Sequence, residues 1–342
     1  MKEINIINTL RVGGAERMLL NHLKISNNKQ NYLLVFRLGP LYKKYLEEVK
    51  NIKIYQIGLG NLWKILQLIK QKDITINAWL YHSCLFSVML KCFNPYAILH
   101  WNIRSNIINT NEKITKNTTK CVIYLLSILS RIPKKILYNS HDSQKNHELY
   151  GFKGFSEILY NFCDKDIFYR RNSSFNERFK KRLGLSPDQR IILFVGRNHP
   201  VKNFNLFKDT AKKMSENKMF VFICLGVENK TIKQDNLICF RSSKSPQYFY
   251  SISDILFQTS ISESFPNVLL EASACECLLL ASDVGDSNLI AHRDFLFDPH
   301  KPINFQKVFM KMLAAKDEII IEQNKKNKKF LKLEITGKHC ES

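Results

Sequence analysis

Acidic side chains are scarce in this sequence. Its 342 residues include 30 Asp and Glu against 52 Lys and Arg, which gives a formal net charge of +22. Residues 1–165 hold +14 of this charge and residues 166–342 hold +8. An excess of positive charge attracts nucleic acid, anionic lipid and phosphorylated ligands alike, so it disfavours strongly basic partners without choosing among the anionic ones.

Long apolar runs are also missing. No run of about 18 apolar residues occurs, which excludes an evident membrane-spanning helix. The strand-like run Ile4–Ile7 begins almost at the start, without the apolar segment of a secretory signal. The nine cysteines are scattered, only Cys275 and Cys277 lie close together, and no CxxC pair suggests zinc. We therefore expect a cytoplasmic protein with reduced thiols.

Short, continuous apolar runs alternate with segments of helical spacing. Ile4–Ile7, Leu33–Phe36, Ile191–Val195 and Phe220–Leu225 have the composition of buried parallel strands. Alternating strands and helices predict an α/β fold. The pattern restarts at Ile191 after a polar stretch, so we predict two doubly wound domains, residues 1–164 and 165–342. In such folds ligands bind outside the carboxyl ends of the strands, and we expect an active-site cleft between the two domains.

Two glycines follow the first predicted strand. Gly13 and Gly14 lead into a helix, where unpaired backbone amides favour a phosphate and glycine lets the backbone approach it. A tight strand-to-helix turn would need the same glycines, so this pattern alone leaves both interpretations open.

Two cations follow the strand that opens the second domain. Arg197 and Lys202 would point toward the cleft, where arginine grips a phosphate through two parallel hydrogen bonds and lysine acts as a point charge. Such a pair suits a diphosphate leaving group. The alternative is a pair of solvated loop cations.

Two carboxylates lie eight residues apart around a proline. Glu263 precedes Pro266, which is well placed to begin a helix, and Glu271 follows inside that helix. Carboxylates accept hydrogen bonds from sugar hydroxyls. A helix-stabilising Glu together with a surface Glu would give the same pattern.

Five segments in this order resemble glycosyltransferase family 4, the retaining GT-B enzymes that use nucleotide-activated sugars. The segments are Gly13–Arg17, Trp79–His82, His100–Arg104, Val195–Asn203 and Glu263–Asp286, the last including Ser282–Asp286. The resemblance covers residues 1 to about 300. It implies a GT-B fold of two Rossmann-like domains, with an acceptor-binding first domain and a nucleotide-sugar-binding second domain.

The resemblance also implies roles for individual residues. Glu271 would hold the ribose hydroxyls, Glu263 would lie beside the transferred sugar, and Arg197 with Lys202 would neutralise the departing diphosphate. His100, expected to emerge at a strand end in the cleft, would position sugar hydroxyls; a merely local role for it stays open. The remaining expected donor contacts are Gly13, Gly14, Ser264, Phe265, Pro266 and Asn267.

The implied activity is that of a hexosyltransferase of cell-surface polysaccharide or lipopolysaccharide synthesis. It would use a UDP- or GDP-sugar, retain the anomeric configuration, and need neither a cofactor nor a metal because the cations replace it. The acceptor would be a glycan or a lipid-linked sugar. Nucleic acid is not an expected partner.

A basic, apolar segment of the first domain suggests contact with a membrane. Lys113, Lys116 and Lys120 precede the apolar run Cys121–Leu129, which is too short to span a bilayer. It could lie in the interface on the inner face of the cytoplasmic membrane, with its cations on anionic lipid. A core helix of the first domain is the equal alternative.

Three places depart from the family pattern. Glu276-Cys277-Leu278 stands where Gly-x-Pro is common, so the turn there lacks its usual residues. Asn161-Phe162-Cys163-Asp164 likewise stands where Asn-Gly-x-Asp is usual, so Phe162 takes the place of a glycine at the domain crossing. From Lys325 onward we expect a short basic tail in place of a long closing helix, with an altered domain closure.

Two other functions remain open on the sequence. A nucleotide-sugar epimerase can share the two-domain fold and would release free sugar without an acceptor. A non-catalytic protein that binds membranes or nucleic acid would explain the charge, although no nucleic-acid-binding motif supports it. A dehydrogenase is disfavoured because Gly13-Gly14 lacks the GxGxxG spacing.

Overall fold

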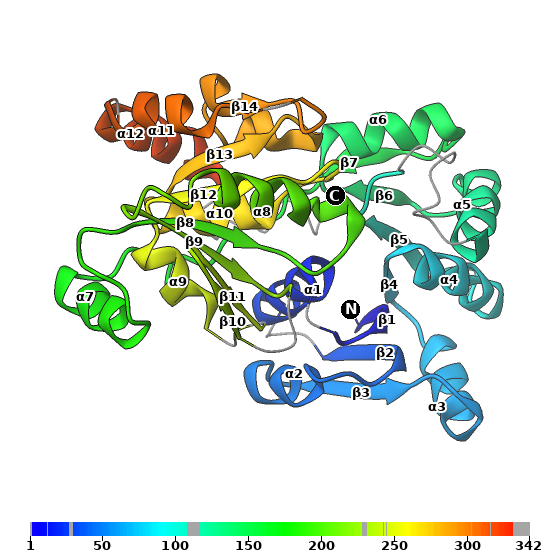
Figure 1. Cartoon of the computed structure of the whole chain (residues 1–342). Helices are drawn as coiled ribbons and strands as arrows, with labels where there is room; N and C mark the ends of the chain where they lie inside the picture. Colours follow the sequence, from blue (N-terminus) through cyan, green and yellow to red (C-terminus); the bar gives the residue numbers. More distant parts are fainter. Residues whose placement is uncertain are drawn as a thin grey trace. The chain divides into compact units, whose positions relative to one another are not determined.

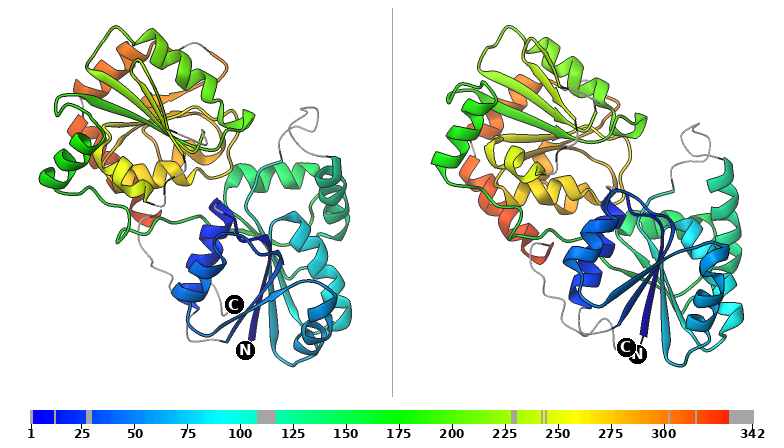
Figure 2. Two further views of the ribbon diagram at one scale, coloured as in Figure 1. Left: turned by 60° about the horizontal axis from the view of Figure 1, so that its bottom comes forward. Right: turned by 90° about the horizontal axis from the view of Figure 1, so that it is seen from below.

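The chain forms two compact units, Met1–Tyr160 and Asn161–Ser342, each built around a seven-stranded sheet (Figures 1 and 2). The computed structural model describes residues 2–11, 13–26, 30–107, 117–227, 231–241, 243, 245–301, 303–314 and 316–330. The sequence places the domain boundary at Asp164, and the structure divides the chain after Tyr160.

The first unit contains a parallel sheet of order β3-β2-β1-β4-β5-β6-β7. Its strands are β1 Lys2–Thr9, β2 Asn31–Arg37, β3 Ile52–Gln56, β4 Ile74–Trp79, β5 Ile98–Ile103, β6 Lys135–Tyr138 and β7 Ser156–Ile158. Its helices are α1 Gly14–Ile25, α2 Tyr42–Glu48, α3 Leu59–Ile69, α4 Tyr81–Phe93, α5 Asn117–Leu129 and α6 His141–Tyr150.

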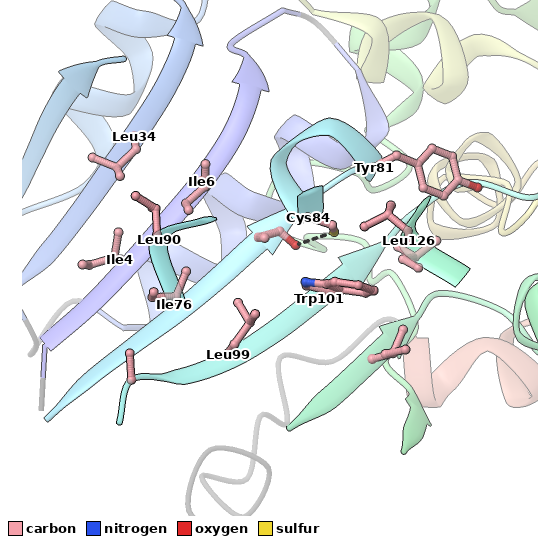
Figure 3. Close-up of a cluster of buried hydrophobic side chains, with 14 of the residues drawn as sticks. Ile4, Ile6, Leu34, Ile76, Tyr81, Cys84, Leu90, Leu99, Trp101 and Leu126 are labelled. Carbon is pink, nitrogen blue, oxygen red and sulfur yellow. Dashed lines mark hydrogen bonds between the residues drawn. The ribbon is translucent and has the colours of Figure 1, made fainter. Parts of the chain in front are cut away.

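One face of this sheet is apolar and packs under α3, α4 and α5. Alternate residues of a strand point to the same face, so Ile4 and Ile6 of β1 meet Ile76 of β4 and Leu99 of β5. Figure 3 shows these side chains together with Cys84 and Leu90 from α4 and Leu126 from α5. The opposite face carries polar residues, among them Asn5, Asn77 and His100, beside the buried apolar Leu33 and Val35.

The second unit has the sheet order β10-β11-β9-β8-β12-β13-β14, in which only the β10–β11 pair is antiparallel among the described strands. Its strands are β8 Arg190–Val195, β9 Phe220–Leu225, β10 Ile232–Gln234, β11 Leu237–Phe240, β12 Ile255–Gln258, β13 Leu278–Ser282 and β14 Leu296–Phe297. The α-helices are α7 Ser173–Arg182, α8 Phe204–Lys213, α9 Pro246–Ile252, α10 Asn267–Ala274, α11 Phe305–Ala314 and α12 Lys316–Asn327. Short 3₁₀ turns are η1 Pro200–Lys202, η2 Gly285–Leu289, η3 Arg293–Phe295 and η4 Lys328–Phe330.

Aromatic rings fill the core of the second unit. Phe207 of α8 lies 5.4 Å from Phe222 of β9 and 5.9 Å from Phe257 of β12, measured between ring centroids. Phe305 and Phe309 of α11 close the cluster against Phe220. Two parallel sheets covered by helices confirm the predicted α/β, doubly wound class.

The described part of the basic segment after Lys325, which ends at Phe330, continues the helix α12 and then the turn η4. Residues 316–327 form the helix α12, in which Gln323 and Asn327 are buried. Asn327 Nδ2 donates to Ser273 Oγ at 2.9 Å, and Gln323 Nε2 donates to the Cys277 carbonyl at 3.2 Å. Buried amide side chains thus hold this helix against α10 and β13. Because these amides are polar, the composition of the segment resembles that of a solvated tail.

A glutamate ends α10 in a left-handed conformation. Glu276 has φ 60°, its N–H donates to the Ser273 carbonyl, and the Cys277 N–H donates to the Ala272 carbonyl, each at 3.0 Å. This pair of hydrogen bonds is the Schellman motif, which usually carries glycine. The turn therefore keeps its geometry without the family's glycine.

We expect Glu276→Gly to raise the free energy of unfolding by about 1 kcal/mol. A Cβ in the left-handed region costs roughly 1–2 kcal/mol, which the greater freedom of glycine in the unfolded chain partly offsets. Urea denaturation measures the difference. Glu276→Ala keeps the Cβ and should give no such gain; equal gains in both variants would contradict this account.

His147 of α6 is buried as a neutral ring. Its Nδ1 lies 2.6 Å from the Ser143 carbonyl and therefore donates, which leaves Nε2 to accept from the Tyr81 hydroxyl at 2.8 Å. Burial lowers the pKa of His147 to about 4 from 6.5, and the bond to Ser143 only partly opposes this shift.

We expect the chain to lose stability as the pH falls below about 6.5. An unfolded His147 binds a proton near its ordinary pKa of 6.5, whereas the folded ring resists protonation down to about pH 4. At pH 5 the loss from this residue is about 2 kcal/mol relative to pH 8. Urea denaturation at both pH values, with His147→Gln beside the native chain, measures it.

His147→Gln should reduce this pH dependence by about 2 kcal/mol, because glutamine can accept from Tyr81 but does not titrate, while His100, whose pKa is lowered too, keeps its own share. The exposed His300 provides the control, and His300→Gln should leave the profile unchanged. Parallel profiles for the native chain and His147→Gln would refute the assignment.

Candidate functional site

Two loops meet at the carboxyl edge of the second sheet. The chain leaves β8 toward β9 on one side, whereas β12 pairs with β8 on the other side, so the strand order reverses between β8 and β12. Open α/β sheets bind ligands at such a switch point. Gly196–Lys202 follows β8, and Thr259–Glu263 follows β12.

Lys202 and Glu263 form an ion pair across this switch point. Lys202 Nζ lies 2.5 Å from Glu263 Oε1, and Ser260 Oγ donates to the same oxygen at 2.7 Å. The two charged side chains keep only 24% and 14% of their surface exposed, so each is largely shielded from water. Both charged residues were predicted from the sequence, and Ser260 was missed. The only sequence signal for Ser260 is that it forms a polar pair with Thr259 directly after the strand β12.

Further hydrogen bonds join the two loops. Thr259 Oγ1 donates to the carbonyl oxygens of Lys202 and Asn203, each at 3.0 Å, and the Ile261 N–H donates to the Val201 carbonyl at 2.8 Å. Asn203 has a left-handed φ of 47°, which asparagine tolerates better than most residues. Lys202 therefore projects from a loop that is tied along its length to the end of β12.

Gly285 holds the Glu263 loop from the other side. Its φ is 55°, and a Cβ there would lie 2.5 Å from the carbonyl oxygens of both Glu263 and Ser264. The Asp286 N–H donates to the Ser264 carbonyl at 3.1 Å. The segment Ser282–Asp286 therefore sets the position of the Glu263 backbone, and only glycine permits this approach.

The other predicted donor contacts lie around the start of α10. Pro266 is the N-cap, so the helix begins one residue later than expected, at Asn267. Asn267 Oδ1 accepts a hydrogen bond from Asn161 Nδ2 at 2.8 Å. Ser264 and Phe265 are buried in the loop before the helix, and Glu271 is buried inside it.

Arg197 follows β8 at the same edge as Lys202. Its side chain is exposed, and no carboxylate of the described residues forms an ion pair with it. The second unit thus presents one paired cation and one solvated cation at its switch point.

The two predicted glycines of the first unit follow β1. Gly13 is the N-cap of α1, and Gly14 is its first residue. A Cβ on Gly13 would lie 2.4 Å from Glu16 Oε2, so glycine lets this carboxylate approach the start of the helix. The close approach of the Glu16 carboxylate therefore explains why a glycine stands at position 13. The role of Gly13 toward a phosphate stays a prediction.

His100 does not emerge at a strand end, contrary to the sequence interpretation. It is the third of the six residues of β5, where its Nδ1 lies 3.2 Å from Asn77 Oδ1 on β4. Burial, and then the cations of Lys135 and Lys134, lower the pKa of His100 to about 4. The apolar run before it is the first part of the strand, and the strand continues for three more residues.

Arg104 occupies the place that the sequence assigned to His100. It directly follows β5 at the carboxyl edge of the first sheet, beside Trp79 and Leu80 at the end of β4. The strand-end position expected for His100 thus belongs to Arg104, and the role of His100 toward a sugar stays a prediction.

Two features of the described residues bear on the expectations about a metal site and a membrane. Asp164 and Asp166 have a spacing found in metal-binding loops, and Asp164 Oδ1 accepts the Asp166 N–H at 2.9 Å. Within the described ranges, no three His, Cys, Asp or Glu side chains gather as metal ligands would, and no helix has the length and hydropathy to cross a bilayer.

Comparison with known proteins agrees with this architecture. Residues 175–330 match the family model of glycosyl transferases group 1. The chain is 22% identical over 312 residues to CapH, a capsular polysaccharide biosynthesis glycosyltransferase of Staphylococcus aureus, covering 84% of this chain and 83% of CapH. It is 28% identical over 135 residues to TuaC, a teichuronic acid biosynthesis glycosyltransferase of Bacillus subtilis, covering 38% of this chain and about a third, 35%, of TuaC.

Among solved structures, HepE of Anabaena, determined in complex with UDP and glucose, superimposes with a TM-score of 0.83 at 16% identity. The alignment covers 100% of this chain and 98% of HepE, which shows a shared fold. Residues 175–330 thus match the glycosyl transferases of group 1, and the chain as a whole has the GT-B fold.

Proposed function

We propose that this chain transfers a hexose from a UDP- or GDP-sugar to a glycan or lipid-linked acceptor, in the synthesis of a cell-surface polysaccharide or lipopolysaccharide. The Lys202–Glu263 pair at the switch point of the second sheet carries this proposal. HepE, which was determined with UDP-glucose, supports the donor class, and CapH and TuaC support the kind of product.

The pair supplies a cation for the leaving group and an anion for the sugar. When a nucleotide sugar binds, Lys202 can turn from Glu263 to the diphosphate, because its ammonium ends a flexible stem. Arg197 adds a second cation at the same edge. Glu263, still held by Ser260, then accepts hydrogen bonds from the sugar hydroxyls.

The proposed reaction retains the configuration at the anomeric carbon. The bond from this carbon to the phosphate oxygen breaks while the acceptor oxygen bonds to the same face, and the acceptor proton passes to the departing phosphate. Lys202 and Arg197 stabilise the developing negative charge, which is the work that a divalent metal would otherwise do.

We expect Lys202→Ala to lower kcat about 100-fold or more. Removing one preorganised donor from a developing anion typically has an effect of this size. Release of UDP or GDP from the sugar nucleotides, in the presence of glycan and lipid-linked acceptors, measures the rate.

The exposed Lys208 of α8 provides a matched control. Lys208→Ala removes the same charge from the same unit and should leave transfer unchanged. Turnover of Lys202→Ala within twofold of the native chain would show that the site is misassigned.

An anionic lipid surface is also part of the proposal, with the first unit as its binding face. Of the 21 exposed large apolar side chains in the described residues, 15 belong to this unit. The outward stripe of α5 carries Tyr124, Leu125 and Ile128, and Phe93 and Tyr96 are exposed at the end of the adjacent α4. The inward side chains of α5, Ile123 and Leu126, are in the core, so the helix has two apolar faces.

Basic residues accompany the apolar stripe. Arg131 and Lys134 are exposed just after α5. Such a combination of apolar and basic side chains is typical of a surface that binds anionic lipid. Lys120 lies in the first turns of α5, and Lys113 and Lys116 fall outside the described residues.

We expect Ile128→Glu combined with Tyr124→Glu to abolish flotation with vesicles that contain phosphatidylglycerol. Each change puts a negative charge into the stripe that would contact the lipid. Ile321→Glu, at an equally exposed position on α12, should float like the native chain. Flotation that survives the α5 changes would exclude this surface.

A further inference from the structure

Arg104 is a cation held by neutral groups. Its Nη1 donates to the Leu159 carbonyl at 2.5 Å and its Nη2 to Asn102 Oδ1 at 3.0 Å. The guanidinium carbon lies 5.1 Å from the centre of the Trp79 ring, a cation–π distance. These contacts fix the plane of the guanidinium at the carboxyl edge of β4 and β5.

No carboxylate balances this charge within the described ranges. None of the ion pairs there includes Arg104, and its Nε is buried without an acceptor. Burial accordingly lowers the pKa of Arg104 to about 9. A charge that is partly removed from water and has no counter-ion destabilises the folded state, so a residue kept for stability alone would have an acidic neighbour here.

The neighbouring backbone is strained. Leu80 has φ 71° and ψ 160°, a region that essentially only glycine occupies, and its N–H donates to the Asn102 carbonyl at 3.1 Å. Such strain amounts to roughly 1–3 kcal/mol and persists where surrounding contacts enforce it, as at ligand sites. It sits directly after Trp79, the ring that packs on Arg104.

The location is that of a ligand site. The first sheet reverses its strand order between β1 and β4, and β5 pairs with β4. The guanidinium has five N–H donors, of which two are used in the contacts above. The hydrogen bond of Nη1 lies at the surface, so the outer edge of the guanidinium is accessible to a ligand.

We propose that Arg104 binds an anionic phosphoryl oxygen of a substrate, held ready by Trp79, Asn102 and the Leu159 carbonyl. The inference rests on the proposed transfer reaction, which offers two sources of this oxygen: the diphosphate of the donor and the phosphate of a lipid-linked acceptor. Arginine suits either one, because its planar fork matches two phosphate oxygens.

Titration calorimetry without turnover tests this proposal. The probes are UDP for the donor and geranyl phosphate for the acceptor. Arg104→Gln should raise the Kd of one probe at least tenfold: a loss for UDP identifies the donor diphosphate, and a loss for geranyl phosphate identifies the acceptor. Arg178→Gln, at an exposed arginine of α7, should change neither.

Thermal unfolding separates binding from a structural role. Because the charge is unbalanced, Arg104→Gln should melt at the same temperature as the native chain or higher. If this variant does not fold, Arg104→Lys, which keeps the charge and loses the fork, should still lose at least fivefold in affinity for the same probe.

The proposal is overturned if both Kd values stay within twofold of the native chain, or if the native chain binds neither probe. Failure of the Arg104 proposal can be distinguished from failure of the proposed sugar transfer. A chain that transfers no sugar but loses probe affinity in Arg104→Gln would refute the transfer and keep the anion site.

Discussion

The parallel pairing of β8 with β12 is the constraint on which the rest of the second unit's site depends. It brings Lys202 and Glu263 within 2.5 Å of one another although 61 residues separate them in sequence. Thr259 then ties the Lys202 loop to the end of β12, and Gly285 presses the next loop against Glu263. A parallel sheet does this because all its strands end at one edge, so every loop that follows a strand meets its neighbours there.

Lys202 and Arg104, two cations that follow strands, are held in opposite ways. Lys202 has a carboxylate partner, Glu263, which a phosphate would replace in the proposed reaction. Arg104 has only neutral partners, so its charge stays unbalanced in the chain alone. The net charge of +22 therefore does more than attract anions over the whole surface. A few cations at strand ends lie where they can act chemically, and others, such as Arg131, lie on outward surfaces.

Local composition is a poor guide to the structure at three places in the chain. The apolar run ends before His100, which favours a strand end there, but β5 continues through Trp101, Asn102 and Ile103, and His100 contacts Asn77 of β4. Residues after Lys325 were taken for a tail because lysine and asparagine are abundant, but buried amides of Gln323 and Asn327 dock them as a helix. At Glu276 the family's glycine is missing and the sequence leaves the turn geometry open, but the hydrogen bonds of the helix end hold the left-handed conformation. At His100 and in α12, contacts between residues distant in sequence outweigh local composition.

The α/β class, the alternation of strands and helices, and the motif residues after β8 and β12 could all be predicted from the sequence alone. Buried parallel strands give short apolar runs, and the loops after them contain glycine, so both can be recognised locally. The sequence also identified Lys202, Glu263 and the segment Ser282–Asp286. The pairing of Lys202 with Glu263, the hydrogen bond from Ser260, and the position of Arg104 rather than His100 just after β5 come from the tertiary structure. These depend on strand register and on burial, which arise from pairings between distant segments and leave no trace in the neighbouring residues.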